Sequence, residues 1–240
     1  MAELIDEVPG IALAVYAHPD DPEVSCGGTL ARWAAAGCHV HVALCTRGEK
    51  GSSDPAIDTV ALAALRRDEV EAARRITGVD VVHHLDHGDG EVENDPALRR
   101  QLVELIRRIQ PDVVVGPDPT ATFFGQTYVN HRDHRVVGWA ILDAVSPAAA
   151  SPHYFPGSGP PHAVHALYLS GTLEPNAFVD IGDTLDVKAE ALACHASQLN
   201  EPGEWLRAFV SERAEEAGRA TGVRYAEAFR RIVLAPPSPD

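Results

Sequence analysis

The sequence predicts an α/β fold, a Rossmann-like and mostly parallel sheet flanked by helices in a three-layer sandwich. Short runs rich in Val, Leu and Ala alternate along the chain with helix-like segments of ten or more residues. This alternation is typical of right-handed βαβ units. The runs are apolar throughout instead of at every second residue, as expected for parallel strands that are covered on both faces.

Each element is recognised by composition and by its end signals. Strands are expected at residues 13–17, 40–46, 79–85, 112–116, 166–169 and 178–181. Helices are expected at residues 30–36, 59–77, 96–109, from Asn130 to residue 142, and at 185–195, 204–218 and 225–229. Gly78 is a typical helix stop, and Pro96 suits a first helical turn. Asn130 suits a helix N-cap, and Gly27-Gly28 suits a tight strand-to-helix turn. Residues 117–130 are interpreted as a broken segment, and residues 146–161, rich in Pro, Ser, Ala and Gly, as a loop.

Bulk composition narrows the class of protein. The chain has 240 residues, of which 45% are hydrophobic, so we expect a single domain over 1–240, with 231–240 a partly irregular C-terminal tail. With 20 basic and 35 acidic residues the net charge is −15, which argues against nucleic acid and anionic membranes as partners. The acidic start lacks the regions of a signal peptide, and the four cysteines form no C-x-x-C pair, so we expect a reduced, cytoplasmic protein.

Chemistry-bearing residues follow the first predicted strand. The run at 13–17 stops at His18-Pro19-Asp20-Asp21. Pro19 cannot donate to a sheet ladder, so the strand ends there. In open α/β sheets, ligands bind outside the carboxyl ends of the strands, which is where these side chains are placed.

A second group follows a later strand of the same sheet. His131 and His134 are three residues apart, on one face of a first helical turn, with Asp133 between them. Histidine and carboxylate suit zinc, and a catalytic zinc takes three protein ligands and one water. Neither group alone supplies three ligands and a spare base, but together they do.

The two adjacent aspartates are expected to divide their roles. Asp20 and Asp21 cannot easily point to one spot, so one would bind metal and the other would face the bound water. A metal lowers the pKa of that water to about 7, and a nearby carboxylate can take its proton. The residues alone leave open which aspartate does which.

The motifs resemble one known family. Segments 17–21, 27–30 and 131–135 (AHPDD, GGTL and HRDHR) are similar to those of the LmbE-like (PIG-L) zinc-dependent deacetylases. Residues 66–69, the Asp89-Gly90 pair, residues 188–198 and residues 225–229 give further support. The resemblance covers most of the chain.

The resemblance implies hydrolysis of an N-acetyl group on a glucosamine-containing small molecule, such as an N-acetylglucosamine derivative. It makes His18, Asp21 and His134 the zinc ligands and Asp20 the general base. It makes His131 the electrophilic or acid group, oriented by Asp133.

Four other residues, in or near the segments that follow the predicted strands, each have two possible roles. Arg66 and Asp89 are expected to contact substrate, and a packing role is the alternative for each. Arg47 and His195 are further candidates with the same alternative. Pro22 stands where many members of the family have Glu, so no role is assigned to a Glu at that position.

Alternative functions stay open. The same chemistry would serve an amidase of a thiol conjugate or a secondary metabolite, and a non-catalytic metal-binding scaffold would keep the fold. A nucleotide-binding protein is disfavoured, because the chain has no G-x-G-x-x-G after a strand and no P-loop. Iron(II) can replace zinc in a reducing cytoplasm, and family members often assemble, so a homo-oligomer is also open.

Overall fold

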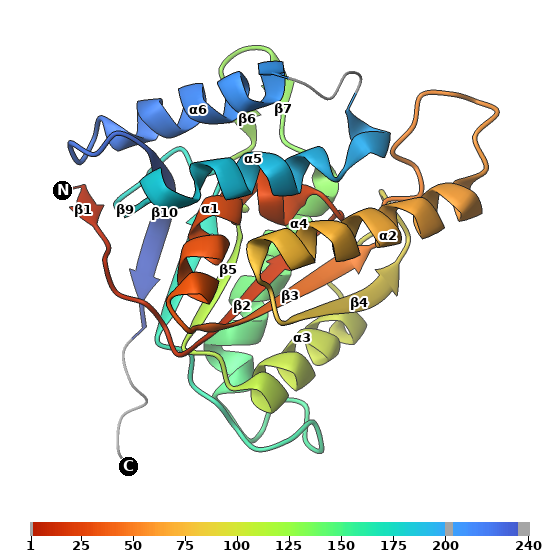
Figure 1. The fold of residues 1–240 in the computed structure, drawn as a ribbon. Helices are drawn as coiled ribbons and strands as arrows, with labels where there is room; N and C mark the ends of the chain where they lie inside the picture. The colour runs from red at the N-terminus through yellow and green to blue at the C-terminus, as the bar shows by residue number, and fades with distance from the viewer. Residues whose placement is uncertain (1, 200–203, 235–240) are drawn as a thin grey trace.

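The computed structural model describes residues 2–199 and 204–234. In this part of the chain an eight-stranded sheet has the order β1-β9-β10-β8-β5-β2-β3-β4. Its strands are β1 (Glu3–Leu4), β2 (Ile11–Tyr16), β3 (His39–Thr46), β4 (Val81–His87), β5 (Val113–Pro117), β8 (Ala166–Ser170), β9 (Ala177–Asp180) and β10 (Ala226–Val233). All neighbours pair in parallel except β10, which is antiparallel to both β8 and β9 (Figure 1). The predicted mostly parallel sheet is confirmed.

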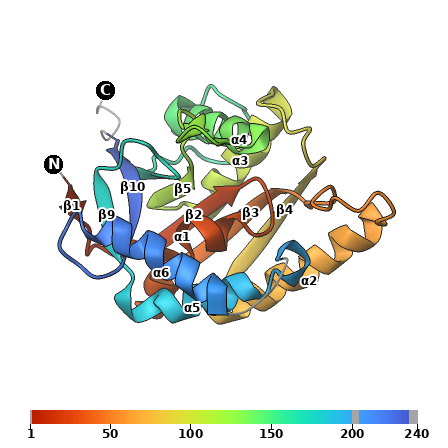
Figure 2. The ribbon, with the colours of Figure 1, turned by 90° about the horizontal axis from the view of Figure 1, so that it is seen from above.

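Helices cover both faces of this sheet, as a three-layer sandwich requires (Figure 2). They are α1 (Asp21–Ala35), α2 (Thr59–Thr77), α3 (Pro96–Ile109), α4 (Arg132–Asp143), α5 (Leu185–Ala193) and α6 (Glu204–Gly218). In β2, Leu13 and Val15 pack toward α3 and α4, while Ala14 and Tyr16 pack toward α1. Helices α5 and α6 add a smaller core of their own outside α1. None of the helices in the described residues is apolar and long enough to span a membrane.

The central strand β2 sits where the strand order reverses. Its neighbours are β3, which follows it in the chain, and β5, which comes much later. Such a reversal leaves a crevice at the carboxyl ends of the strands, because the two connections depart in opposite directions. His18 follows β2 at this point, and the segment after β5 leads to α4.

Helices with clear local signals have the predicted bounds. Helix α2 is capped by Asp58, whose carboxylate accepts from Val60 N and Ala61 N, and it ends at Gly78 with a φ of 78°. Helix α3 is capped by Asp95 and has Pro96 in its first turn. Side-chain caps and a left-handed glycine are properties of the local sequence, so these ends could be read from it.

The expected helix at 225–229 is wrong, because Ala226–Val233 form β10. Its Ala and Glu content favours a helix, but the segment fills the space between β8 and β9 and buries Phe229. Tertiary packing overrides such weak local preferences. Of the expected partly irregular tail at 231–240, residues 231–233 belong to β10, and 235–240 lie outside the described residues.

Helix α1 begins at Asp21, well before the expected start at Leu30. Pro22 lies in its first turn, a position that favours proline. A kink at Cys26 divides the helix, and Gly28 N and Thr29 N then donate to the Glu227 carboxylate, at 3.1 and 2.7 Å. The expected strand-to-helix turn at Gly27-Gly28 is therefore a kink within α1.

Two segments expected to be irregular contain structure. A π-helical turn at Ala144–Ala149 extends α4 into the predicted loop at 146–161. The segment between β5 and α4 holds a small hairpin of β6 (Phe123–Phe124) and β7 (Tyr128–Val129). This hairpin leads directly into His131.

Candidate metal centre

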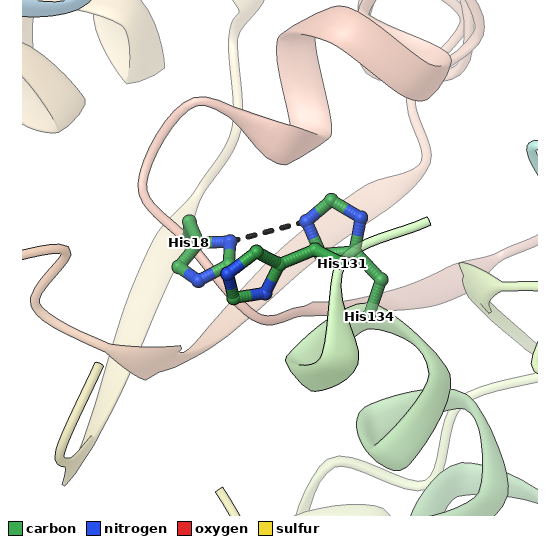
Figure 3. A group of neighbouring side chains, drawn as sticks. All are labelled: His18, His131 and His134. Carbon is green, nitrogen blue, oxygen red and sulfur yellow. Dashed lines mark hydrogen bonds between the residues drawn. The ribbon is translucent and has the colours of Figure 1, made fainter. Parts of the chain in front are cut away.

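Three side chains converge at the end of β2. His18 Nδ1 lies 3.1 Å from His134 Nε2 (Figure 3). His18 Nδ1 also lies 3.4 Å from Asp21 Oδ2, and His134 Nε2 lies 3.1 Å from Asp21 Oδ1. Zinc–nitrogen bonds of 2.0–2.1 Å in a tetrahedral site place ligand atoms about 3.3 Å apart. The two histidine nitrogens and the Asp21 carboxylate, which faces each nitrogen with a different oxygen, therefore have the spacing that the ligand atoms of a zinc-like ion require.

The outer nitrogen of each ligand histidine is held by a partner. His134 Nδ1 lies 3.1 Å from Asn130 Oδ1, and Asn130 Nδ2 donates to Ala121 O at 2.8 Å, which orients the amide. The amide oxygen can only accept, so His134 carries its proton on Nδ1 and leaves the Nε2 lone pair for a metal. His18 Nε2 lies 3.2 Å from Asp89 Oδ1 and thus leaves Nδ1 for the metal. Such partners are typical of metal-ligating histidines.

The local charge favours a cation. Burial lowers the pKa of His18, but Asp133, Asp21 and Asp89 outweigh burial and raise it to about 12. Burial raises the pKa of Asp21, yet His134 and His18 hold it well below its usual range. The ring of His18 thus stands among three carboxylates, and a divalent cation can replace its second proton.

The ring of His131 also lies at this cluster, against the ring of His18. His131 is the N-cap of α4, and its Nδ1 accepts from Asp133 N at 3.2 Å. Its ring meets His18 edge-on, with centroids 4.6 Å apart, and the ring nitrogens of His18, His131 and His134 offer atoms within 4.8 Å of one another. Burial, His18 and His134 lower the pKa of His131, which favours the neutral ring. Because Nδ1 accepts from Asp133 N, the neutral ring has its proton on Nε2. This leaves an N–H donor at the site.

Asp133 is fully buried, and none of the described hydrogen bonds joins its carboxylate to the His131 ring. Its Oδ2 accepts from Gly90 N at 2.7 Å and lies 3.6 Å from His18 Nε2. The link to His131 runs through the Asp133 backbone N–H alone. Asn130, expected to cap α4, instead holds His134, and His131 takes the capping position.

Asp20 precedes the candidate ligand Asp21 in the chain, and its carboxylate is held by Arg66. Arg66 Nη2 donates to Asp20 Oδ1 at 2.6 Å, and Nη1 donates to Gly48 O at 2.9 Å. The Arg66 side chain is only 3% exposed, while that of Asp20 is 26% exposed. A Cβ on Gly48 would lie 2.2 Å from Arg66 Nη1, so glycine is required there. The carboxylate is thus fixed but open to solvent.

Asp89 connects the loop after β4 to the loop after β3 and contacts His18. Its Oδ2 accepts from Lys50 N at 3.0 Å, and its own N–H donates to Glu49 Oε1 at 3.0 Å. The carboxylate is buried, with its other oxygen on His18. Arg47, by contrast, is half exposed and lies 3.9 Å from Asp86, away from this cluster.

A buried pair that the sequence did not reveal supports the start of α1. His195 Nε2 lies 3.1 Å from Glu23 Oε2, and His195 is fully buried. Two residues later, Ser197 donates through its N–H and its hydroxyl to Glu69 of α2, both at 2.7 Å. Only the family motif at 188–198 pointed to this segment, because the contact joins residues 172 positions apart.

The fold and the site define an α/β protein with a candidate mononuclear metal centre at the switch point of its sheet. Comparison with known proteins gives the family. Residues 13–145 match the family model "PIG-L: GlcNAc-PI de-N-acetylase", so the chain belongs to the PIG-L (LmbE-like) family.

Relatives agree with this assignment. Diacetylchitobiose deacetylase of Thermococcus kodakarensis is 34% identical over 225 residues, which cover 92% of this chain and 82% of the relative. The structure of N,N'-diacetylchitobiose deacetylase from Pyrococcus horikoshii matches with a TM-score of 0.85 at 30% identity, covering 94% of this chain and 84% of that one. GalB, the 4-carboxy-2-hydroxymuconate hydratase from Pseudomonas putida, matches with a TM-score of 0.76 at 26% identity, covering 95% and 98%.

Proposed function

We propose that this protein is a metal-dependent N-deacetylase that removes an acetyl group from an N-acetylated amino-sugar small molecule, in the cytoplasm. The observation that carries the proposal is the triangle of His18, Asp21 and His134 with the carboxylate of Asp20 beside it. The two related deacetylases support the reaction class and the amino-sugar substrate. The four cysteines are free, in keeping with a reducing compartment.

The donor set fits zinc, with iron(II) as the alternative. His18, Asp21 and His134 would hold the ion, because two imidazoles and one carboxylate form a common catalytic zinc set. When bound, the metal would polarise the amide carbonyl and lower the pKa of a water to about 7.

The chain's own residues supply the remaining chemistry. Asp20 takes the proton of the attacking water, and Arg66 fixes the direction of its free oxygen. The Nε2–H of His131 donates to the carbonyl oxygen as charge develops there. The proton that Asp20 took from the water then goes to the departing amine. Asp89 and Asp133 hold His18, and Asn130 holds His134.

Arg66 and Asp89 were expected to contact substrate, and this stays a prediction. Their described contacts favour positioning roles for both, since Arg66 binds Asp20 and the Asp89 oxygens are engaged by His18 and Lys50 N. Asp133 also has a positioning role in this proposal, directed to His18 more than to His131.

Acetate release tests the function. The protein is stripped with chelator, reloaded with Zn²⁺ or Fe²⁺, and supplied with a panel of N-acetylated amino sugars and thiol conjugates. Acetate and a free amine in equal amounts support the proposal, and the panel decides between the amino-sugar substrate and the thiol-conjugate alternative. Metal binding without hydrolysis of any amide would identify a scaffold, and a hydratase like GalB would release no acetate.

Asp20→Asn tests the base. We expect this variant to retain the metal and to lose about 10²-fold or more of kcat, because the amide cannot accept the proton. Asp183→Asn, an exposed position before α5, is the matched control with unchanged turnover. Full activity of the Asp20→Asn variant would contradict the assignment.

A further inference from the structure

A cavity of about 500 Å³ opens between α1, α6, the β6–β7 hairpin and the start of β10. Its volume lies within the range of small-molecule binding sites. The side chains of the candidate metal centre are not part of its lining, so it is a separate compartment. Nothing in the proposed reaction of an acetyl group requires a space of this size.

The cavity begins one helical turn from the metal centre. Val24 and Ser25 line it, and they follow Asp20 and Asp21 by four residues on the same face of α1. Val24 N donates to Asp20 O at 3.1 Å, which shows that the first turn is regular there. Side chains at this spacing have Cβ atoms about 5–6 Å apart. The near wall of the cavity therefore lies one helical turn from Asp20 and Asp21.

The opposite wall belongs to the hairpin that precedes the other half of the site. Phe124 of β6 lines the cavity, and the hairpin is closed by Asn130 N donating to Thr122 O at 2.8 Å. Asn130 in turn holds His134. Both segments that bring the metal ligands together thus also border the cavity.

The lining accepts apolar groups. Val24 and Phe209 are among the large hydrophobic side chains that remain exposed, at 37% and 41%, and both face this space. Four charged residues also line it: Lys188 and Glu227 are buried and bonded to each other, whereas Arg213 and Glu216 are exposed on α6, with the Arg213 guanidinium over the Phe209 ring. Lys188 Nζ also donates to Val24 O, and Glu227 accepts from Gly28 N and Thr29 N.

This distribution selects the kind of occupant. An alkyl or aryl group would gain from removal of its surface from water. We propose that the cavity binds an apolar substituent of the substrate, attached to the amino sugar at the end remote from the acetyl group. This inference rests on the proposed deacetylase function.

A matched pair of substrates tests it. The metal-loaded full chain is supplied with the methyl and the octyl β-glycoside of N-acetylglucosamine, the latter below its micelle concentration. We expect kcat/KM for the octyl glycoside to exceed that for the methyl glycoside by about tenfold or more, since each buried methylene contributes. Equal values in the wild-type protein would overturn the proposal.

Two substitutions in α6 locate the effect. Ala217→Phe places a large side chain in the cavity, and we expect it to reduce the ratio of the two kcat/KM values at least about fivefold. Ala208→Phe makes the same change at an exposed position of α6 outside the lining, and it should leave both rates and their ratio unchanged. An equal loss in both variants would contradict the assignment. Ala217→Leu replaces Ala217→Phe if the larger side chain prevents folding.

Binding separates this proposal from the proposed reaction. Octyl β-glucoside has no amide, so its binding, followed by ligand-observed NMR, does not depend on turnover. If neither glycoside is hydrolysed, the deacetylase proposal fails on these substrates. Binding of octyl β-glucoside to wild type and to the Ala208→Phe variant, but not to the Ala217→Phe variant, would still support the cavity proposal. Absence of binding to the wild-type protein would overturn the cavity proposal.

Discussion

The buried guanidinium of Arg66 donates from Nη2 to Oδ1 of the partly exposed Asp20 carboxylate at 2.6 Å. The two side chains are 3% and 26% exposed. The guanidinium is itself fixed by the carbonyl of Gly48 and enclosed by the loop at 48–51. One oxygen of the proposed base is thereby occupied, and the other is left to face the reaction. The contact connects α2 to the chemistry at the start of α1.

This contact predicts that Arg66 acts through the base. Arg66→Met should lower kcat about 10²-fold with little change in KM, because a misplaced base costs turnover more than binding. Arg66→Lys should recover only part of it, since an ammonium cannot reproduce the fork geometry. Steady-state kinetics check both, with Arg67→Met at the exposed neighbouring position as control. A rise in KM with unchanged kcat would instead show direct substrate contact.

Asn130 should control metal affinity. Asn130→Ala removes the acceptor from His134 Nδ1, and we expect the affinity for zinc to fall about 10–100-fold. Asn130→Asp keeps an oxygen acceptor and should retain most of the affinity. Competition with a chromophoric chelator measures the change. Asn94→Ala, at a partly exposed position before α3, is the control. Unchanged zinc affinity of the Asn130→Ala variant would remove Asn130 from the metal centre.

The pair of Glu23 and His195 should stabilise the fold. Burial raises the pKa of Glu23, and the hydrogen bond from His195 opposes this effect. His195→Phe would leave the carboxyl group buried without this partner, so we expect a loss of about 2–4 kcal/mol in the free energy of unfolding. Urea titration at pH 7 measures it, with the exposed Glu190→Gln as control. Unchanged stability together with a lower kcat would assign the pair to catalysis alone.

The histidine pair of β3 and β4 predicts a pH dependence. Burial, with His41 and Arg108 nearby, lowers the pKa of His83 to about 4, and its ring stacks on His41. The unfolded chain therefore binds a proton at a higher pH than the folded protein does. This contribution to stability falls as pH drops from about 6.5 to about 4 and is constant below that range.

Replacing His83 should reduce this loss. In His83→Phe, the fall in Tm between pH 7 and pH 4.5 should be smaller than in wild type by ~2 °C, because solvent screens a half-buried group. Thermal unfolding at a series of pH values measures the difference. His165→Gln, at a largely exposed position, should keep the wild-type dependence. An identical pH dependence of the His83→Phe variant and wild type would contradict the assignment.

Much of this architecture could be predicted from local signals. The bounds of α2 and α3 depend on Asp58 and Asp95, which cap the helices next to them. The convergence of residues 18–21 with 131–134 follows from the rule that parallel strands end at one edge. The family resemblance added the choice of Asp21 as ligand over Asp20, and the distances are consistent with that choice.

The remaining features depend on contacts between distant residues. Strand β10 has a helical composition and is extended only because β8 and β9 leave a gap between them. Glu23 meets His195 from the far end of the chain. Asn130 looks like a helix cap from sequence, and only the three-dimensional position of His134 gives it another partner. No local pattern encodes these pairings.

The carboxylate of Glu227 on Gly28 N and Thr29 N has a consequence for how the protein is made. The second half of α1 receives its cap from a residue almost two hundred positions later in the chain. During synthesis on the ribosome, the second half of α1 therefore lacks this cap until β10 has emerged and entered the sheet. We expect this half of the helix to gain its full stability only at that stage.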